Sequence, residues 1–361
     1  MAVKLKPVRE QVIVITGASS GIGLATARMA AARGARVVLS ARSRDALAQA
    51  VDAIRQAGGD AVSVAADVTR RDELEAVAAT AIDRFGGFDT WVNNAGVGIW
   101  GRIDEVDESD MRQLFETNFW GVVYGSEVAL RHLKGKGGAL INVGSVTSDR
   151  ALPVQGIYSA SKHAVKGFTD ALRMELEEEK APVSVTLIKP ASIGTPMPQH
   201  VRNYTGREAR FPPPVYAPEE VAATILRAAE RPVRDAFIGS GARTLGSLAG
   251  TAPRLLDWVS ARFLVPAQFG DKPATPTDNL YHGRAEGEVR GDHQGATIRP
   301  SVYSKAARHP AVTLTAAGVA AAGVGAFLWS RRNREEDDQV RPLSAPAIAG
   351  YGQAQAEAHP S

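Results

Sequence analysis

The chain has 361 residues, of which 44% are hydrophobic and 22% are charged, and both fractions are ordinary for a globular protein. It contains no cysteine, which excludes a disulfide framework and a thiolate metal site. The formal net charge is only +3, so nucleic acid is not expected as the main partner. The first ten residues lack the apolar core of a signal peptide, and the main domain is therefore expected to fold in the cytoplasm.

The first predicted unit is a strand, a glycine-rich loop and a helix. Residues 12–15 are apolar, residues 17–23 read Gly-Ala-Ser-Ser-Gly-Ile-Gly, and residues 24–33 follow a helical pattern. Glycines let the backbone turn tightly and approach a pyrophosphate, and the helix N-terminus adds N–H donors. The spacing differs from the general G-x-G-x-x-G fingerprint, but its place between a strand and a helix favours nucleotide binding over a turn without a ligand.

The second predicted strand, residues 37–40, is followed by Ala41 and Arg42. A site that prefers NAD places an acidic residue here, where it binds the ribose 2'-hydroxyl. That acid is missing, and a guanidinium forms paired hydrogen bonds with phosphate. Arg42 therefore indicates the 2'-phosphate of NADP(H), and the alternative is a solvated surface arginine.

Strands and helices continue to alternate. The further predicted strands are 61–66, 90–93, 139–143, 183–189 and 236–238, and the further predicted helices are 45–57, 71–85, 109–133 and one that ends near 179. This alternation predicts an α/β fold with a doubly wound parallel sheet of about seven strands. Ligands of such sheets bind at the carboxyl ends of the strands. The residues that follow predicted strand ends include Arg42, Asp67, Asn94, Ser145 and Pro190.

Tyr158 and Lys162 are four residues apart on a predicted helix, which puts both side chains on one face. A free phenol has a pKa near ~10, and a nearby ammonium lowers it. The pair is therefore a candidate acid/base, and Ser145 adds a hydroxyl that can steady a substrate oxygen. The alternative is an ordinary amphipathic helix with a tyrosine and a lysine on its surface.

Several short motifs follow one another in a specific order. They are Thr16-Gly-Ala-Ser-Ser-Gly-Ile-Gly23, Asp67-Val68, Asn93-Asn94-Ala95-Gly96, Asn118, Ser145, Tyr158-Ser-Ala-Ser-Lys162 and Pro190 to Thr195. In their order and separations, residues 10 to about 240 resemble the single-domain, NADP(H)-preferring branch of the short-chain dehydrogenase/reductase family, which has a Rossmann-type fold. One departure is Pro190-Ala191, where the family often has Pro-Gly.

The resemblance implies a catalytic role for four residues. Tyr158 would give a proton to a carbonyl or take one from an alcohol, and Lys162 would lower its pKa and hydrogen-bond the nicotinamide ribose. Ser145 would hold the substrate oxygen, and Asn118 would fix a water that links Lys162 to solvent. The cofactor would carry the hydride. The implied cofactor-binding residues are Gly17, Ser19, Ser20, Gly21, Ile22, Gly23, Arg42, Asp67, Val68, Asn94, Ala95, Gly96, Tyr158, Lys162, Pro190, Ile193 and Thr195.

Two segments after Pro190 are expected to lie outside the sheet. Residues 196–217, which contain three consecutive prolines, are expected to form a lid over the substrate, and the alternative is a passive surface loop. Residues 241–270 are expected to form a helical cap packed on the sheet domain. Leu255, Leu256, Val259 and Phe263 share a helical face, and arginines occur in the same stretch, so binding to a membrane surface is the alternative. The domain is expected to span residues 1–270.

The remaining chain changes in character. Residues 271–310 are rich in proline, glycine and charge and predict a disordered linker. Residues 311–330 contain an uncharged run followed by arginines, which predicts a transmembrane helix, although its alanine and glycine content also fits a soluble or dimerising helix. Residues 331–361 predict a disordered tail. The expected location is a cytoplasmic catalytic domain anchored to a membrane by this helix.

The sequence thus predicts an NADP(H)-dependent oxidoreductase. It would act as a carbonyl reductase or alcohol dehydrogenase on an apolar ketone, aldehyde or alcohol, with a Ser-Tyr-Lys-Asn active site. A homo-oligomer is expected, and nucleic acid and resident metal are not. The alternative function is a sensor or scaffold protein that binds NADP(H) and turns over little, which would have no need of Asn118, Ser145, Tyr158 and Lys162.

Overall fold

The computed structural model describes residues 3–239, 253–284, 287–293 and 297–298. The chain divides into one unit of residues 1–308 and a second of residues 309–361, and every described residue belongs to the first. The predicted transmembrane helix at 311–330 and the tail at 331–361 lie outside the described residues. Within the described ranges, no helix combines the length and the apolar character needed to cross a membrane.

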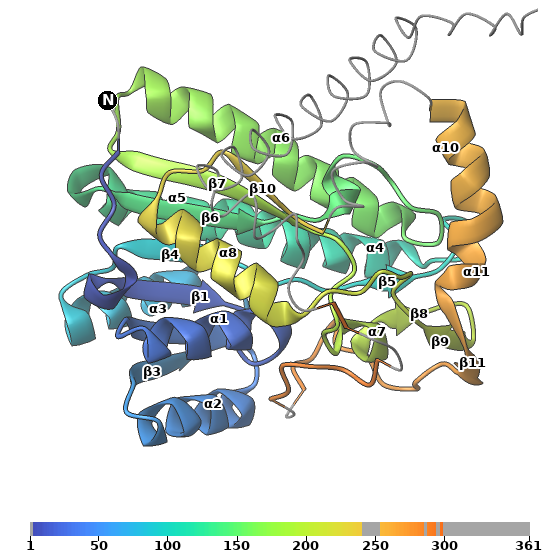
Figure 1. The fold of residues 1–361 in the computed structure, drawn as a ribbon, viewed down its shortest axis with the longest axis horizontal. Coiled ribbons are helices and arrows are strands. Elements are labelled where there is room, and N and C mark those ends of the chain that lie inside the picture. Colours follow the sequence, from blue (N-terminus) through green and yellow to red (C-terminus); the bar gives the residue numbers. More distant parts are fainter. Residues whose placement is uncertain (1–2, 240–252, 285–286, 294–296, 299–361) are drawn as a thin grey trace, which may run out of the picture. The chain divides into compact units, whose positions relative to one another are not determined.

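A parallel sheet of seven strands forms the centre of the unit, in the order β10-β7-β6-β4-β1-β2-β3 (Figure 1). This confirms the predicted α/β class and doubly wound sheet. The chain runs outward from β1 to β3, then returns to the other side of β1 at β4, so the strand order reverses between β1 and β4. The strands are β1 Val12–Thr16, β2 Arg36–Ala41, β3 Asp60–Ala65, β4 Thr90–Asn93, β6 Gly138–Val143, β7 Val183–Pro190 and β10 Asp235–Ile238.

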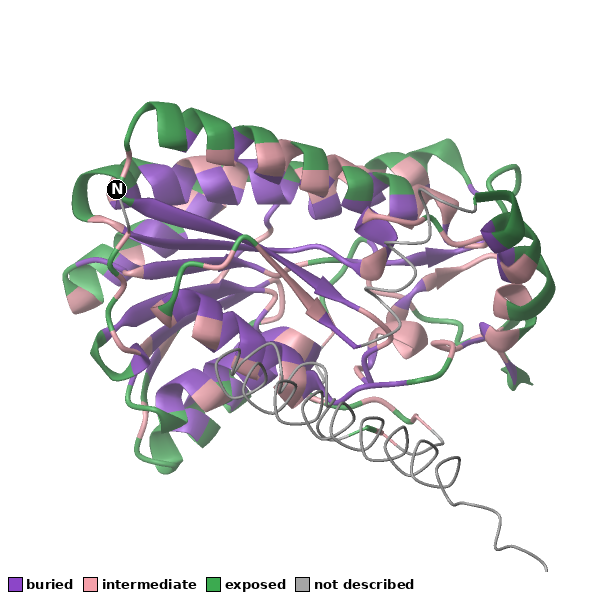
Figure 2. Ribbon diagram, turned by 45° about the horizontal axis from the view of Figure 1, so that its top comes forward, coloured by how far each residue is buried: buried purple, intermediate pink, exposed green. Residues whose placement is uncertain are grey.

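Helices cover both faces of the sheet, which explains why the strands are continuous apolar runs. In β1 all five residues are buried; Ile13 and Ile15 belong to one hydrophobic cluster, while Val12 and Val14 belong to another. Figure 2 shows the strands as a buried layer between helices. The first cluster includes α1 Gly21–Ala32, α2 Arg44–Gln56 and α8 Pro218–Glu230, and the second includes α3 Arg71–Phe85, α5 Gly121–Lys136 and α6 Gly156–Glu178.

The helix predicted at 109–133 contains an irregular turn. It begins as α4 Glu108–Phe115, passes through a π-helical turn, η2 Glu116–Trp120, and continues as α5. Single π-turns inside α-helices are rare and often occur at functional sites. This one contains Asn118.

Short elements surround the carboxyl ends of the strands. They are η3 Val146–Ser148, α7 Met197–His200, the pair β5 Ile99–Trp100 and β8 Arg202–Asn203, the pair β9 Arg207–Ala209 and β11 Phe269–Pro273, and the helical run α10 Pro253–Val259, η4 Ser260–Leu264 and α11 Val265–Ala267. A further short helix, η1 Val8–Glu10, precedes β1 at the amino end of that strand. The predicted helical cap thus has a described part at 253–267. Its apolar face is not packed as we expected, because Leu255, Trp258 and Phe263 are more than half exposed and only Leu256 is buried.

The described part of the predicted linker is ordered, which differs from the expectation. Residues 271–273 belong to β11, and Leu280 is completely buried against Val97 and Ile99. The Tyr281 hydroxyl donates to Asp110 at 2.8 Å, and Arg202 pairs with Asp278 at 3.0 Å. One buried leucine and bonds to distant residues therefore order a segment whose composition predicts disorder.

Candidate active site

The glycine loop between β1 and α1 is shaped by backbone conformation and close contact. Gly17 has a φ of +64°, and a Cβ there would lie 2.7 Å from the Cα of Ala95. A Cβ on Gly23 would lie 2.2 Å from the carbonyl oxygen of Gly17, so the first turn of α1 can approach the loop only without a side chain. This places the N-terminus of α1, with its N–H donors, at the carboxyl end of β1.

Four hydrogen bonds join this loop to the residues that follow β4. The Thr16 hydroxyl accepts the N–H groups of Asn94 at 3.0 Å and Ala95 at 3.2 Å. The Asn94 amide donates to the carbonyl oxygens of Thr16 at 2.9 Å and Gly17 at 3.2 Å. The side chain of Asn94 thus holds the glycine loop, a structural role that the motif alone did not show.

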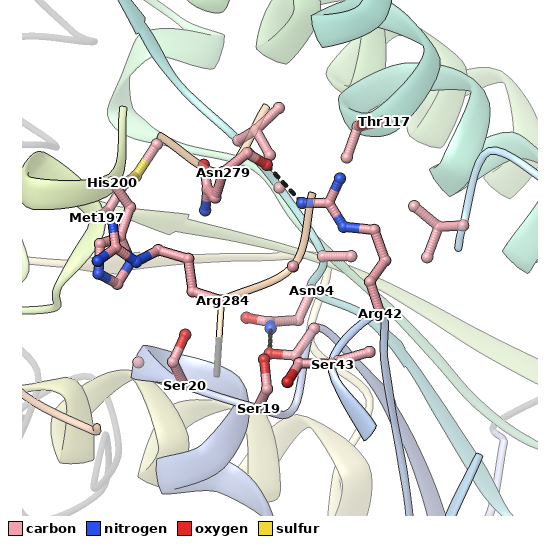
Figure 3. A pocket seen from close by; sticks show the side chains of 18 of the residues that line it. Ser19, Ser20, Arg42, Ser43, Asn94, Thr117, Met197, His200, Asn279 and Arg284 are labelled. Carbon is pink, nitrogen blue, oxygen red and sulfur yellow. Dashed lines mark hydrogen bonds between the residues drawn. The ribbon is translucent and has the colours of Figure 1, made fainter. Parts of the chain in front are cut away.

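Two adjoining cavities lie along the carboxyl ends of the strands, with volumes of about 180 and 120 Å³. The first follows the glycine loop (Figure 3), and the second contains the catalytic candidates. Predicted residues that line the first are Gly17, Ser19, Ser20, Gly21, Ile22, Arg42, Asp67, Val68, Asn94, Ala95, Gly96 and Thr195. Those that line the second are Ile22, Asn94, Gly96, Ser145, Tyr158, Lys162, Pro190, Ile193 and Thr195. The shared residues make the two cavities one elongated site.

Gly23 and Asn118 line neither cavity. Gly23 is placed behind the loop, against Gly17. Asn118 is fully buried, accepts the N–H of Val97 at 2.8 Å, and donates to the carbonyl oxygen of Val97 at 3.0 Å and to the Ser161 hydroxyl at 3.2 Å. A Cβ on Gly96 would lie 3.4 Å from the Asn118 Oδ1 and 3.7 Å from the Lys162 Nζ, so Gly96 lies between these two side chains.

Ser145 and Lys162 are buried beside the second cavity, and the half-buried Tyr158 lies with them. Lys162 donates to the carbonyl oxygen of Val143 at 3.0 Å, and its Nζ lies 5.8 Å from the centre of the Tyr158 ring. Ser145 follows β6 and begins η3, where its hydroxyl accepts the N–H of Thr147 at 3.1 Å. The α6 spacing therefore brings the predicted pair to the same place as the hydroxyl that follows β6.

The pKa values differ from the sequence expectation. Burial raises the pKa of Tyr158 to about 12, against a hydrogen bond with Ser145 that acts to lower it. Burial also lowers the pKa of Lys162 to about 8. The expectation that Lys162 would lower the pKa of Tyr158 does not hold in this structure, because removal from water is the largest influence on both groups.

Arg42 stands at the end of β2 and is not the solvated surface residue of the alternative interpretation. Its guanidinium donates to the carbonyl oxygens of Asn279 and Leu280, the latter at 3.1 Å. Burial lowers its pKa, and the nearby charge of Asp67 acts in the opposite direction. Arg42 therefore faces the first cavity while it holds a segment more than 230 residues later in the chain.

The loop after β7 closes the other side of the glycine loop. A Cβ on Gly21 would lie 3.3 Å from the Thr195 side chain, and Ile193 is buried. Ala191, where the family pattern often has glycine, donates its N–H to Ile238 at 3.1 Å and has no positive φ. Alanine therefore fits this backbone without strain, and the departure does not disturb the site.

Some lining residues were not among the predicted site residues, although Met197, Phe211 and Pro212 lie in the segment 196–217 that was expected to cover the substrate. One wall of the second cavity is formed by Val146, Leu152, Met197, Phe211 and Pro212 and is mostly apolar. The first cavity is also lined by Asn279, Gly283 and Arg284, from the segment predicted to be a linker. Nothing local in that segment indicates a binding role, because its place depends on contacts with distant residues.

Comparison with known proteins identifies a family and a relative of similar length. The family model described as short chain dehydrogenase matches residues 11–205. An uncharacterized oxidoreductase of Bacillus subtilis, YxnA, is 44% identical over 336 residues, which is 92% of this chain and 93% of the relative. That match extends far beyond residue 205.

Two solved structures are similar in fold. A short chain dehydrogenase/reductase from Burkholderia phymatum in complex with NAD is 28% identical, with a TM-score of 0.62 over 71% of this chain and 96% of the other. An alcohol dehydrogenase from Thermococcus sibiricus complexed with 5-hydroxy-NADP is 28% identical, with a TM-score of 0.55 over 63% of this chain and 94% of the other.

Proposed function

Because the chain belongs to the short-chain dehydrogenase/reductase family and is an oxidoreductase that uses a nicotinamide cofactor, we propose that it is NADP(H)-dependent and interconverts a carbonyl compound and an alcohol. One observation carries this proposal. Ser145, Tyr158 and Lys162 line a cavity that adjoins the glycine-loop cavity, so a substrate oxygen and a dinucleotide can lie side by side.

The proposed chemistry assigns one task to each polar group. The cofactor, when bound, supplies or accepts the hydride at the substrate carbon. The Tyr158 hydroxyl gives its proton to the substrate oxygen during reduction, and its raised pKa keeps that proton in place at neutral pH. Ser145 hydrogen-bonds the same oxygen, and Lys162 carries positive charge below pH about 8. Asn118 holds the backbone at Val97 beside this group.

Two further features support the finer parts of the proposal. Arg42 occupies the end of β2, where an acidic residue would favour NAD, and it lines the first cavity. The apolar wall formed by Leu152, Met197 and Phe211 fits an apolar carbonyl compound. These features support NADPH as the preferred cofactor and an apolar ketone, aldehyde or alcohol as the substrate class.

A panel of apolar ketones and aldehydes, followed by the absorbance of NADPH, tests the proposal against the sensor alternative. The native protein should oxidise NADPH with at least one member of the panel and should use NADPH in preference to NADH. Tight NADPH binding without oxidation across the panel would instead favour a sensor or scaffold. Preference for NADH would contradict the assignment of Arg42.

A further inference from the structure

A part of the C-terminal segment crosses the dinucleotide cavity. We call residues 277–284 and 287–291 the strap. Its Asn279, Gly283 and Arg284 line the cavity opposite the glycine loop. The carbonyl oxygen of Glu288 accepts the N–H of Gly21, the first residue of α1, at 2.9 Å. The strap therefore touches both the phosphate-binding loop and the end of β2, where it accepts the hydrogen bonds of Arg42.

The strap packs closely against both borders of the cavity, and at two of its glycines a Cβ would be crowded by neighbouring atoms. A Cβ on Gly283 would lie 3.0 Å from the Cβ of Arg42 and 3.0 Å from the Ser43 nitrogen. A Cβ on Gly291 would lie 2.6 Å from the Thr195 carbonyl oxygen. The strap thus passes from β2 to the loop after β7 in direct contact with both borders of the cofactor cavity.

Anchors hold the strap in this place. Asp110, which is 3% exposed, accepts hydrogen bonds from Tyr204 at 2.7 Å and Tyr281 at 2.8 Å, and it pairs with Arg202 at 2.7 Å. Arg202 also pairs with Asp278 at 3.0 Å. With Leu280 buried behind them, these bonds make the strap part of the folded domain.

The two arginines at the cavity lie over different parts of it. Arg42 is at the end of β2, next to Ser43. Figure 3 shows Arg284 on the side of the cavity above Ser20, with its side chain directed away from Arg42 toward Met197 and His200. The Arg284 guanidinium donates to the Thr277 hydroxyl at 2.8 Å, which fixes it at the cavity wall.

These positions match the two separate phosphate groups of NADP(H). In this fold the pyrophosphate lies at the glycine loop and the adenosine ribose at the end of the second strand. Resting on the proposed function, we propose that the strap is an additional wall of the dinucleotide site and that Arg284 binds the cofactor pyrophosphate, while Arg42 binds the 2'-phosphate. A guanidinium has five N–H donors. Arg42 donates two of these N–H groups to strap carbonyl oxygens, and the remaining N–H groups can bind phosphate.

Two cofactor fragments separate these roles. ADP-ribose has the pyrophosphate but no 2'-phosphate, and adenosine 2'-monophosphate has the reverse. In calorimetric titrations of the full chain, Arg284→Ala should weaken ADP-ribose by roughly tenfold to a hundredfold and leave adenosine 2'-monophosphate within about twofold. Arg42→Ala should weaken adenosine 2'-monophosphate more than ADP-ribose, and a smaller loss of ADP-ribose affinity is expected because Arg42 also holds two strap carbonyl oxygens. Lys272→Ala, which removes an exposed cation from β11 just before the strap, is the matched control and should change neither affinity.

The outcomes distinguish this inference from the proposed function. Native protein that binds neither NADPH nor either fragment would overturn both. Native protein that binds them, with ADP-ribose affinity unchanged in Arg284→Ala, would overturn the role of Arg284 alone. Equal loss of both fragments in Arg284→Ala would also contradict it, because that result means a displaced strap. Arg284→Lys should retain part of the ADP-ribose affinity, since the positive charge remains.

Discussion

Tyr158 lies next to the buried Ser145 and Lys162, and removal of its hydroxyl from water raises its pKa to about 12. It is therefore protonated at neutral pH and suited to give a proton to a carbonyl oxygen. Tyr158→Phe removes that proton and little volume. We expect the turnover number to fall by about 10²–10⁴, with the NADPH dissociation constant nearly unchanged. Steady-state rates and titration of NADPH would check this, and near-native turnover would remove Tyr158 from its role.

The pKa of Lys162 leads to a prediction about how the reaction rate depends on pH. Burial lowers its pKa to about 8, so its positive charge is present below that pH and is lost above it. The rate of carbonyl reduction at saturating NADPH should therefore decline as the pH rises through about 8, well before Tyr158 titrates near 12. A rate that stays constant far above pH 8 would show that the charge of Lys162 does not support the proton transfer.

Single residues also show what the motifs could not predict. The spacing of Tyr158 and Lys162 predicts a shared face, and the structure places both at one cavity. The sign of the Tyr158 pKa shift was predicted wrongly, because burial cannot be read from a four-residue spacing. Asn94 matched its motif, yet its amide bonds to Thr16 and Gly17 depend on the meeting of two strand ends.

At the scale of elements, the parallel strands were predictable because both faces of the sheet are covered and the strands are therefore mostly apolar, as in the fully buried β1. The π-turn at Glu116–Trp120 was not, because one extra residue in a turn leaves no clear mark on a helical pattern. The strap was not predicted either. Its Tyr281 donates a hydrogen bond to Asp110, which is 171 residues away in the sequence. Local composition, which is rich in proline and glycine, gives no information about such a distant contact.

The contacts of Asp110 with Tyr204, Tyr281 and Arg202 lead to a prediction about the stability of the fold. Burial acts to raise the pKa of Asp110, but hydrogen bonds from Tyr204 and Tyr281 and the charge of Arg202 outweigh burial and lower it. A lowered carboxyl pKa stabilises the fold fully above the unfolded value near ~4, and this contribution is lost as pH falls through the folded value. Asp110→Asn should cost about 1–3 kcal/mol near neutral pH.

Denaturant unfolding of native protein and Asp110→Asn at several pH values would measure this difference. It should be constant above pH ~4–5 and shrink at lower pH. The variant should also weaken NADPH binding, because Tyr281 and Arg202 anchor the strap through Asp110. A difference that grows as the pH falls would contradict the sign of the pKa shift.

At the scale of the whole molecule, the site combines the family's sheet with a later part of the chain. The described residues that line the two cavities, including the proposed catalytic residues, all precede residue 285. The uncharged run at 311–329 lies outside the described residues and is judged from sequence alone. If it spans a membrane, the full chain should sediment with membranes and resist a high-salt wash, whereas a variant that ends at Pro310 should stay in the supernatant and keep its activity. Release by salt alone would contradict the membrane helix.

Hydride transfer between NADPH and a carbonyl carbon is the central claim, and an isotope measurement tests it most directly. NADPH deuterated at the transferring position of the nicotinamide would be supplied with the best ketone of the panel, and the product analysed by mass spectrometry. We expect one deuterium on the carbinol carbon for each NADPH consumed. Consumption of NADPH without deuterium in an alcohol product would contradict it.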